Sequence, residues 1–360
     1  MAFTPPPYPY DRLDDAKKAA SAHEGGLVDL SIGTPFDPPP ADVVAALGTS
    51  GSERGYPPSI GSKRLREAAV GWMARRFGVE VAVDGVAACV GTKEFVANVA
   101  GWLRLRAPGR DTVLYPSIAY PTYEMGAILA GCRAVPFGDL SGVAEDDARR
   151  ALCLWVNSPA NPTGALTDLG AAAAWGRDHG VPVFSDECYA EFTWDGLPHT
   201  ILEHGLDGVL AVHSLSKRSN LAGLRVGFYA GDPGLVHYLS EVRKHAGFMV
   251  PGPVQAAAVV ALEDDAHVDD QRERYLERLW FFADVLRKEG ATVDLPGGSF
   301  YLWARAPDGD AWGFTRDLAE RGGVLVSPGD LYGPDGAGHV RVALVHPLER
   351  LELVARRLAG

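Results

Sequence analysis

A serine, a lysine and an arginine stand close together in one short segment, at Ser214, Lys217 and Arg225. A lysine amine forms a Schiff base with a carbonyl cofactor when its site lowers its pKa and presents it neutral. Serine and arginine are donors for a phosphate, which arginine holds with two parallel hydrogen bonds. The segment follows an apolar run at 209–212, and small residues around the lysine leave room for a ligand. Together these residue types suit a phosphorylated aldehyde, pyridoxal 5′-phosphate (PLP).

The composition is that of an ordinary globular protein. The 360 residues carry a formal net charge of −12, and 47% are hydrophobic. This excludes disorder for most of the chain and disfavours a nucleic-acid or membrane-surface binder. Residues 1–10 lack the features of a signal peptide, no apolar run reaches the roughly 20 residues of a membrane helix, and the four scattered cysteines predict buried thiols and no metal site. We therefore expect a cytoplasmic enzyme that acts on small molecules.

An alternation of helical and strand patterns predicts the architecture that must position these residues. Helical stretches at 62–77 and 92–106 alternate with short apolar runs, most of which are apolar on both faces. Strands covered by helices on both sides have this pattern. We therefore expect an α/β domain with a largely parallel sheet. The runs lie at 86–90, 112–115, 151–156, 181–185, 209–213 and 225–229.

The pattern changes after residue 250. A helical stretch at about 254–289 precedes alternating strands at 299–304 and 339–345, with a helix near 312–321, which predicts a smaller α+β domain. The proline-rich start predicts an extended arm, followed by a helix over 11–23. We predict three parts. They are an N-terminal arm and segment that packs on the small domain (1–45), a large PLP-binding domain (46–250) and a small C-terminal domain (251–360).

The segment around Lys217 resembles the cofactor-lysine signature of the fold-type I PLP enzymes, and specifically of the class I/II aminotransferases. From Ser214 to Gly227 it has the form Ser-x-Ser-Lys-x-x-Asn-Leu-x-Gly-x-Arg-x-Gly and agrees at every constrained position. Further pieces of the family pattern occur in order along nearly the whole chain. The resemblance implies the PLP-transferase fold of type I, with Lys217 as the attachment point of PLP and as the general base.

Three further residues are expected around the cofactor ring. The resemblance implies that Asp186, at the end of an apolar run, keeps the pyridine nitrogen protonated. Glu187 points elsewhere by strand alternation. Asn161, in the loop Asn157–Gly164, and Tyr189 would contact the phenolic oxygen, and Asn161 is also a candidate substrate contact.

The phosphate is expected at a strand–glycine–helix junction. Gly91, Thr92 and Lys93 occupy such a junction, and backbone amides at a helix N-terminus form a natural phosphate cradle. In the family this loop binds the cofactor phosphate, together with residues at the positions of Ser214 and Arg225. Lys93 departs from the family pattern, and its side chain either adds charge near the phosphate or faces solvent.

The remaining residues that we expect to contact the cofactor or the substrate come from other parts of the chain. Tyr120 would stack on the pyridine face, whereas Tyr123 is expected to be core. Tyr56 would reach the phosphate of the neighbouring subunit, which implies a homodimer with shared active sites. Arg341 would clamp the substrate α-carboxylate, for which a guanidinium suits better than an ammonium, together with the backbone of Gly33.

The substrate is implied by a finer resemblance. Segments at 31–40, 90–94 and 216–223 look like those of actinobacterial N-succinyldiaminopimelate aminotransferases of lysine biosynthesis. This implies glutamate as donor and N-succinyl-2-amino-6-oxopimelate as acceptor, both with a distal polar group that needs a second contact. The candidates for that contact are Lys63, Arg243 and Lys244, although each has the sequence context of a solvated charge.

Other functions share these motifs. An aminotransferase for another amino acid, such as aspartate or an aromatic one, is one alternative. A PLP-dependent carbon–sulfur β-lyase is another, and release of pyruvate and ammonia without a 2-oxo acceptor would reveal it. A PLP-binding sensor module is the non-enzymatic alternative, but such modules carry a fused DNA-binding segment, for which the short proline-rich start leaves no room. A Walker loop, HExxH and GxSxG are all missing from the sequence.

Overall fold

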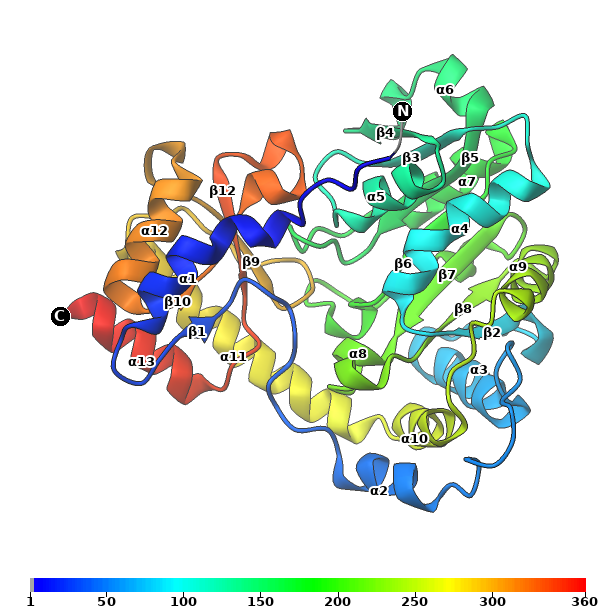
Figure 1. The fold of residues 1–360 in the computed structure, drawn as a ribbon, viewed down its shortest axis with the longest axis horizontal. Coiled ribbons are helices and arrows are strands. Elements are labelled where there is room, and N and C mark those ends of the chain that lie inside the picture. The colour runs from blue at the N-terminus through cyan, green and yellow to red at the C-terminus, as the bar shows by residue number, and fades with distance from the viewer. Residues whose placement is uncertain (1–2) are drawn as a thin grey trace. The chain divides into compact units, whose positions relative to one another are not determined.

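The computed structural model describes residues 3–360, which divide into a large unit and a small unit (Figure 1). The large unit comprises residues 38–273 and 297–299. The small unit comprises residues 3–37, 274–296 and 300–360.

These boundaries differ from the expected ones at 45/46 and 250/251. Helix α2 (Ala41–Thr49) and helix α10 (Gly252–Glu263) pack on each other, and α10 also packs on α3 (Lys63–Phe77). Because Val43, Ala257 and Ala258 lie in one buried cluster with the sheet, both helices belong to the large unit.

A mixed sheet with the strand order β2-β8-β7-β6-β5-β3-β4 forms the centre of the large unit. Strands β7, β6, β5, β3 and β4 are parallel, whereas β8 is antiparallel to both β2 and β7. The predicted largely parallel sheet is therefore confirmed. Strand β4 was not predicted, because it is half exposed and its sequence, Arg-Ala-Val-Pro-Phe, is no apolar run. The strands are β2 (Val86–Cys89), β3 (Thr112–Pro116), β4 (Arg133–Phe137), β5 (Ala151–Asn157), β6 (Val183–Asp186), β7 (Val209–Ser214) and β8 (Gly227–Gly231).

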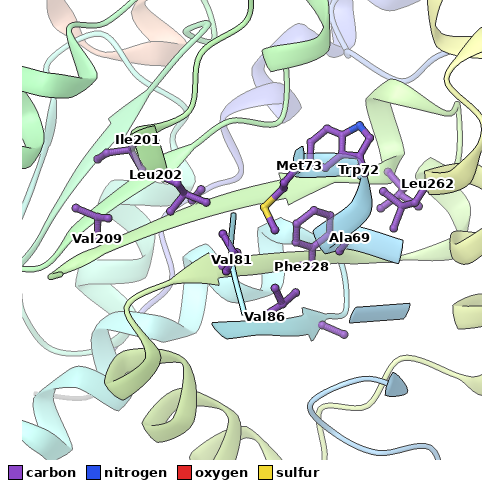
Figure 2. Packing of buried hydrophobic residues seen from close by; sticks show 14 of the residues in the cluster. Ala69, Trp72, Met73, Val81, Val86, Ile201, Leu202, Val209, Phe228 and Leu262 are labelled. Atoms are coloured by element: carbon purple, nitrogen blue, oxygen red, sulfur yellow. The ribbon is translucent and has the colours of Figure 1, made fainter. Parts of the chain in front are cut away.

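Alternate residues of the central strands pack on opposite faces of this sheet. In β5, Leu154 and Val156 lie in one hydrophobic cluster and Trp155 in the other. Figure 2 shows part of the first cluster, in which Trp72 and Met73 of α3 lie over the sheet. Helices α3, α7 and α10 cover that face, and α4, α5 and α9 cover the other. Both faces are buried, which is why the strands have continuous apolar runs.

Several helices of the large unit begin after a residue whose side chain accepts a hydrogen bond from an amide of the first turn. Ser62 accepts from the amide of Leu65, and Asp168 accepts from that of Ala171. The expected helix at 254–289 is two helices, because Asp264 leaves the helical conformation and its side chain accepts from the amide of Ala266 at 2.9 Å. The other helices are α4 (Thr92–Arg106), α5 (Thr122–Leu129), α6 (Glu145–Arg150), α7 (Leu169–His179), α8 (Leu215–Arg218), α9 (Pro233–His245) and α11 (Ala266–Lys288), which continues into the small unit.

The small unit combines the N-terminal and C-terminal segments. Strands β11, β12 and β9 form an antiparallel sheet, and β1 pairs in parallel with β10. Helix α1 packs on α12, so the N-terminal segment folds onto the C-terminal part of the chain. The helix expected at 11–23 starts as a 3₁₀ turn, Pro9–Leu13, before α1. The elements are α1 (Asp14–Ser21), β1 (Val28–Asp29), β9 (Tyr301–Arg305), α12 (Ala311–Gly322), β10 (Val324–Leu325), β11 (Ser327–Pro328), β12 (His339–Ala343) and α13 (Leu348–Ala359).

Among residues 3–360, none of the helices has the length and apolar character needed to cross a membrane. Within the same range, no cluster of three or more His, Cys, Asp or Glu side chains has a geometry that could hold a metal ion.

Candidate active site

The carboxyl ends of β2, β5, β6 and β7 meet at one edge of the large unit's sheet. Asn157, the last residue of β5, stands opposite Asp186, the last residue of β6. Ser214 ends β7, and Gly91 follows β2 after one intervening residue. Arg225 precedes β8, which is antiparallel and therefore begins at the same edge. Ligands of open α/β sheets bind at this edge, so the topology gathers residues that are far apart in sequence.

Lys217 lies on α8, a helix of four residues directly after β7. The Ser214 side chain caps α8 by accepting from the amide of Ser216 at 3.1 Å, which leaves its own hydroxyl proton for another acceptor. Lys217 is half-buried, whereas Ser216 and Arg218 on either side are buried. The lysine amine thus lies at the sheet edge, close enough to the Asp186 carboxylate to interact with its charge.

Arg225 and the start of α4 form a cradle for an anion. Gly91 has φ +72°, and a Cβ at this position would lie 2.3 Å from Arg225 Nη2. The guanidinium therefore lies against the glycine that precedes α4, a helix of 15 residues whose N-terminus has no side-chain cap. Thr92 begins this helix, and Lys93 is exposed on its first turn. Only a glycine fits here, and the donor set is that of a phosphate site.

Glu94 and Arg243 stabilise the junction between β2 and α4 that forms this cradle. Glu94 Oε2 accepts from the amide of Val90 at 3.2 Å. Arg243 is buried and holds both oxygens of Glu94, at 2.5 and 3.0 Å. The expectation that Arg243 is a solvated charge is therefore wrong, and its guanidinium is already committed to Glu94. Lys63 and Lys244 are exposed and pair with glutamates of their own helices.

Asp186 is a buried carboxylate with two fixed donors. Oδ2 accepts from the Tyr123 hydroxyl at 2.8 Å, and Oδ1 accepts from the amide of Cys188 at 3.2 Å. Burial raises the pKa of Asp186, an effect that these hydrogen bonds and the nearby Lys217 oppose. A buried acid of this kind gains most from a cationic partner such as a protonated ring nitrogen.

The sequence did not predict that Tyr123 contacts the site. It is buried, as expected of a core residue, yet its hydroxyl donates to Asp186. Burial raises the pKa of Tyr123 well above 10, so the phenol stays a donor. Tyr120 is half-buried and meets Tyr123 edge to face, with 5.9 Å between ring centroids. The aromatic spacing in 115–123 was visible, but which hydroxyl would reach a carboxylate depends on how α5 packs against β6.

Asn161 and Tyr189 are both buried beside the ends of β5 and β6. The Asn157 side chain holds the loop that carries Asn161: its Oδ1 accepts from the amide of Asn161 at 2.7 Å, and its Nδ2 donates to the backbone oxygen of Asp186 at 2.7 Å. The loop is thereby tied to the strand that ends in Asp186. Tyr189 follows Asp186 by three residues, just before a 3₁₀ turn, Ala190–Phe192.

Glu187 points away from Asp186, as strand alternation predicts. Its Oε1 accepts from the amide of Ile201 at 2.8 Å, and its Oε2 lies 3.4 Å from His213 Nε2. Burial raises the pKa of Glu187 to about 7 and lowers the pKa of His213 to about 3, so both groups are mainly neutral in weakly acidic solution.

Replacing Glu187 with Gln is expected to remove a pH dependence of stability. Because the pKa of Glu187 is raised, the folded protein binds this proton more tightly than the unfolded chain does. Its free energy of unfolding should therefore fall as pH rises from about 4.5 to about 7, by about 3 kcal/mol. Urea unfolding of both proteins at pH 5 and pH 8 measures the difference, with Glu80→Gln as the control at an exposed glutamate. Parallel pH profiles for wild type and Glu187→Gln would contradict the assignment.

In the small unit, Arg341 and Gly33 lie around the same tyrosine. The Arg341 guanidinium carbon lies 4.3 Å from the ring centroid of Tyr301 and 4.7 Å from that of Tyr332, and Nη2 donates to the backbone oxygen of Ser31. A Cβ at Gly33 would lie 2.2 Å from the Tyr301 hydroxyl oxygen. Arg341 is buried rather than an exposed strand residue, and the two rings fix the plane of its guanidinium.

Tyr56 of the large unit is exposed within one chain. It lies in the segment before α3, and its side chain is 99% exposed. A tyrosine of this kind is suited to contact another chain.

The residues of the large unit fit PLP. A lysine, an arginine against a helix N-terminus and a buried carboxylate meet at one sheet edge, and they match the aldehyde, the phosphate and the ring nitrogen of this cofactor. This arrangement on a mostly parallel sheet is that of the fold-type I PLP-dependent transferases.

Comparison with known proteins assigns the family. The sequence profile described as "Aminotransferase class I and II" matches residues 26–358. The chain belongs to the class I and II aminotransferases and is a PLP-dependent aminotransferase acting on amino and 2-oxo acids.

The relatives of this chain are named for several different substrates. It is 43% identical to the 4-dedimethylamino-4-oxo-anhydrotetracycline transaminase OxyQ of Streptomyces rimosus, over 98% of this chain and 99% of that one. It is 34% identical to the LL-diaminopimelate aminotransferase of Desulforudis audaxviator, over 99% and 95%. Among solved structures, a probable N-succinyldiaminopimelate aminotransferase of Thermus thermophilus matches with a TM-score of 0.86 and 34% identity, over 97% and 98%.

Proposed function

We propose that this enzyme transfers an amino group between glutamate and N-succinyl-2-amino-6-oxopimelate, a step of diaminopimelate and lysine biosynthesis, with PLP attached to Lys217. The observation that carries the chemistry is the meeting of Lys217, Asp186 and Arg225 at one sheet edge. The full-length similarity to the Thermus thermophilus protein named for this reaction supports the substrate.

The large unit would hold the cofactor at several points. Arg225, Ser214 and the first amides of α4, from Thr92, would bind the phosphate, and Lys93 would add charge from the helix surface. Asp186 would hold the ring nitrogen protonated, while Asn161 and Tyr189 donate to the phenolic oxygen and Tyr120 stacks on the ring face. When bound, PLP supplies an electron sink for the negative charge that develops on the substrate α-carbon.

Lys217 Nζ would perform the proton transfers. Its amine would act as general base, taking the proton from the substrate α-carbon, and would then return that proton as general acid. The amino acid leaves as a 2-oxo acid, and the second substrate runs the same transfers in reverse. Arg341 would bind the α-carboxylate of each substrate with its fork of N–H donors, together with the backbone of Gly33. Asn161 is a further candidate contact for the substrate.

Transamination of a ring ketone is a second candidate, favoured by the 43% identity to OxyQ over nearly the full length of both chains. Glutamate as donor needs the same Arg341 clamp in either case. The two candidates differ in the acceptor, because a ring ketone has no α-carboxylate for that arginine.

A half-reaction screen tests both candidates. The holoenzyme is mixed with one amino acid at a time, and the loss of the visible band of bound PLP is followed. We expect glutamate to abolish this band. N-succinyl-2-amino-6-oxopimelate, added to the aminated enzyme, should then restore it. Restoration by a tetracyclic ketone alone would support the second candidate. Formation of pyruvate and ammonia from a sulfur amino acid, with no restoration of the band by any oxo compound, would instead indicate a β-lyase.

We further propose a homodimer in which Tyr56 completes the partner's phosphate site. The 99% exposure of this tyrosine within one chain supports a role toward a second chain. Purified heterodimers of Lys217→Ala and Tyr56→Phe subunits are then expected to regain up to about half of wild-type activity, since one of the two sites in each heterodimer is intact. Activity of tagged, purified heterodimers measures this. Heterodimers that stay as inactive as their parents would count against a shared site.

We place the enzyme in the cytoplasm. Its cysteines, at 89, 132, 153 and 188, are all free thiols. Free, mostly buried thiols are typical of a reducing compartment, where the proposed biosynthetic reaction also finds glutamate.

A further inference from the structure

Arg218, the residue after Lys217, points into the core of the large unit. It is 3% exposed. Its Nη1 donates to the backbone oxygen of Ala261 at 2.6 Å and to Ser219 Oγ at 3.0 Å, and its Nε donates to Glu191 Oε1 at 3.1 Å. Two successive helix positions differ by about 100° in direction, so one side chain can serve the site while the next anchors the helix.

Glu191 gathers three donors from two different elements. Oε1 also accepts from Trp72 Nε1 at 2.6 Å, and Oε2 accepts from Arg76 Nε at 2.8 Å, both on α3. The carboxylate is 4% exposed, and the Arg218 guanidinium carbon lies 5.5 Å from the centroid of the Trp72 ring. Arg218 Nη2 makes no hydrogen bond and lies 3.6 Å from Asp265 Oδ1, a second carboxylate near this guanidinium. Breaking a buried ion pair leaves a buried charge poorly compensated.

The two partners stand next to the residues that we assign to the cofactor. Arg218 is adjacent to Lys217, and Glu191 is two residues beyond Tyr189 and five beyond Asp186. The ion pair thus links the segment after β7 to the segment after β6.

Helix α8 is short, and besides Arg218 it is held by Leu215, which is buried in the same hydrophobic cluster as Trp72. It has four residues and a single side-chain cap, from Ser214. The chain leaves it at once, because Asn220 is in the left-handed region with φ 56°. A helix of one turn is not stable by itself. The position of Lys217 therefore depends on the contacts that its neighbours make, those of Arg218 among them.

We propose that Arg218 and Glu191 are positioning residues whose buried ion pair sets the placement of Lys217 relative to Asp186 and Tyr189. The proposal rests on the proposed attachment of PLP to Lys217. It predicts that loss of the pair slows the proton transfers of Lys217 more than it weakens substrate binding, because misplacement of a reacting group by about 1 Å can cost roughly 100-fold in rate.

The test uses Arg218→Met, Glu191→Gln and the double variant as reconstituted holoenzymes. Each single variant is expected to slow the half-reaction with glutamate by about 100-fold, with KM changed less than about threefold. The fraction of Lys217 that borohydride converts to the pyridoxyl adduct at limiting PLP should fall as well. Since both changes break one pair, the double variant should be no slower than the slower single variant, within about twofold. Arg218→Lys keeps a cation for Glu191 and should recover at least about tenfold of the lost rate.

Arg66→Met is the matched control. Arg66 is on α3 like Trp72 and Arg76, and its guanidinium donates to Asp84 and to the backbone oxygen of Val83, each at 3.0 Å. This variant should lose stability and keep the half-reaction rate. If Arg218→Met does not fold, as judged by circular dichroism, Arg218→Lys and Glu191→Gln carry the test.

Folded variants with wild-type rates and wild-type adduct formation would overturn the proposal. Rates that fall independently, so that the double variant multiplies the two losses, would overturn it too. Absence of the adduct at Lys217 in the wild-type protein is a different result, which would refute the proposed function itself.

Discussion

The Lys217→Ala enzyme is expected to lose transamination by at least about 10⁴-fold, the full contribution of a positioned general base. The substitution removes both the attachment point of the cofactor and the amine that moves the α-proton. PLP should still bind through Arg225 and the start of α4, because neither the guanidinium nor the helix amides depend on the lysine. Single-turnover mixing with glutamate, followed at the visible band of PLP, measures the loss.

Borohydride reduction and peptide mass mapping give a second readout of the same prediction. The wild-type protein should carry a pyridoxyl adduct on Lys217, and the variant should carry none. Lys288→Ala, at an exposed lysine of α11, is the control and should leave both rate and adduct unchanged. An adduct on another lysine of the wild-type chain, or a colourless protein that still transaminates, would refute the assignment.

Asp186→Asn is expected to lower kcat by roughly 100- to 1000-fold, the cost of removing one preorganised electrostatic contact. Asparagine can keep its oxygen toward the amide of Cys188 and donate from Nδ2 to the Tyr123 hydroxyl, which can turn to accept, so the site should keep its shape. What disappears is the negative charge that would hold the ring nitrogen protonated, and with it the capacity of the ring to accept electrons. Steady-state kinetics with glutamate measures the change.

Tyr123→Phe is the matched variant for this prediction. It removes a donor to Asp186 and leaves the charge, so the expected loss in kcat is only about tenfold, the value of one hydrogen bond to a charged group. Reconstituting Asp186→Asn with PLP methylated at the ring nitrogen supplies a permanent positive charge and should restore part of the rate. Equal losses in the two variants, or no gain from the methylated cofactor, would show that Asp186 acts through structure and not through charge.

Much of the large unit could be predicted from short-range pattern. The runs at 151–156 and 209–212 are apolar at every residue, and they lie in β5 and β7, which are buried on both faces. Strand β4 escaped prediction, because an edge strand needs no continuous apolar run. The helix at 254–289 was misjudged as one, because a break at Asp264 depends on one side chain capping the next helix. The position of the unit boundary within α11 follows from which partners its two ends pack against.

The sequence by itself indicated the chemistry, because residue types and local spacing can be read directly from it: a serine, a lysine and an arginine in one short segment suit PLP. The resemblance to the class I/II aminotransferases then implied the role of the carboxylate Asp186. Tertiary structure alone decided which neighbours act on these groups. That Tyr123 reaches Asp186, that Arg243 braces Glu94 and that Arg218 joins Glu191 involve residues 63, 149 and 27 positions apart. A buried polar atom takes whichever partner packing brings within 3 Å, and packing is a property of the folded chain.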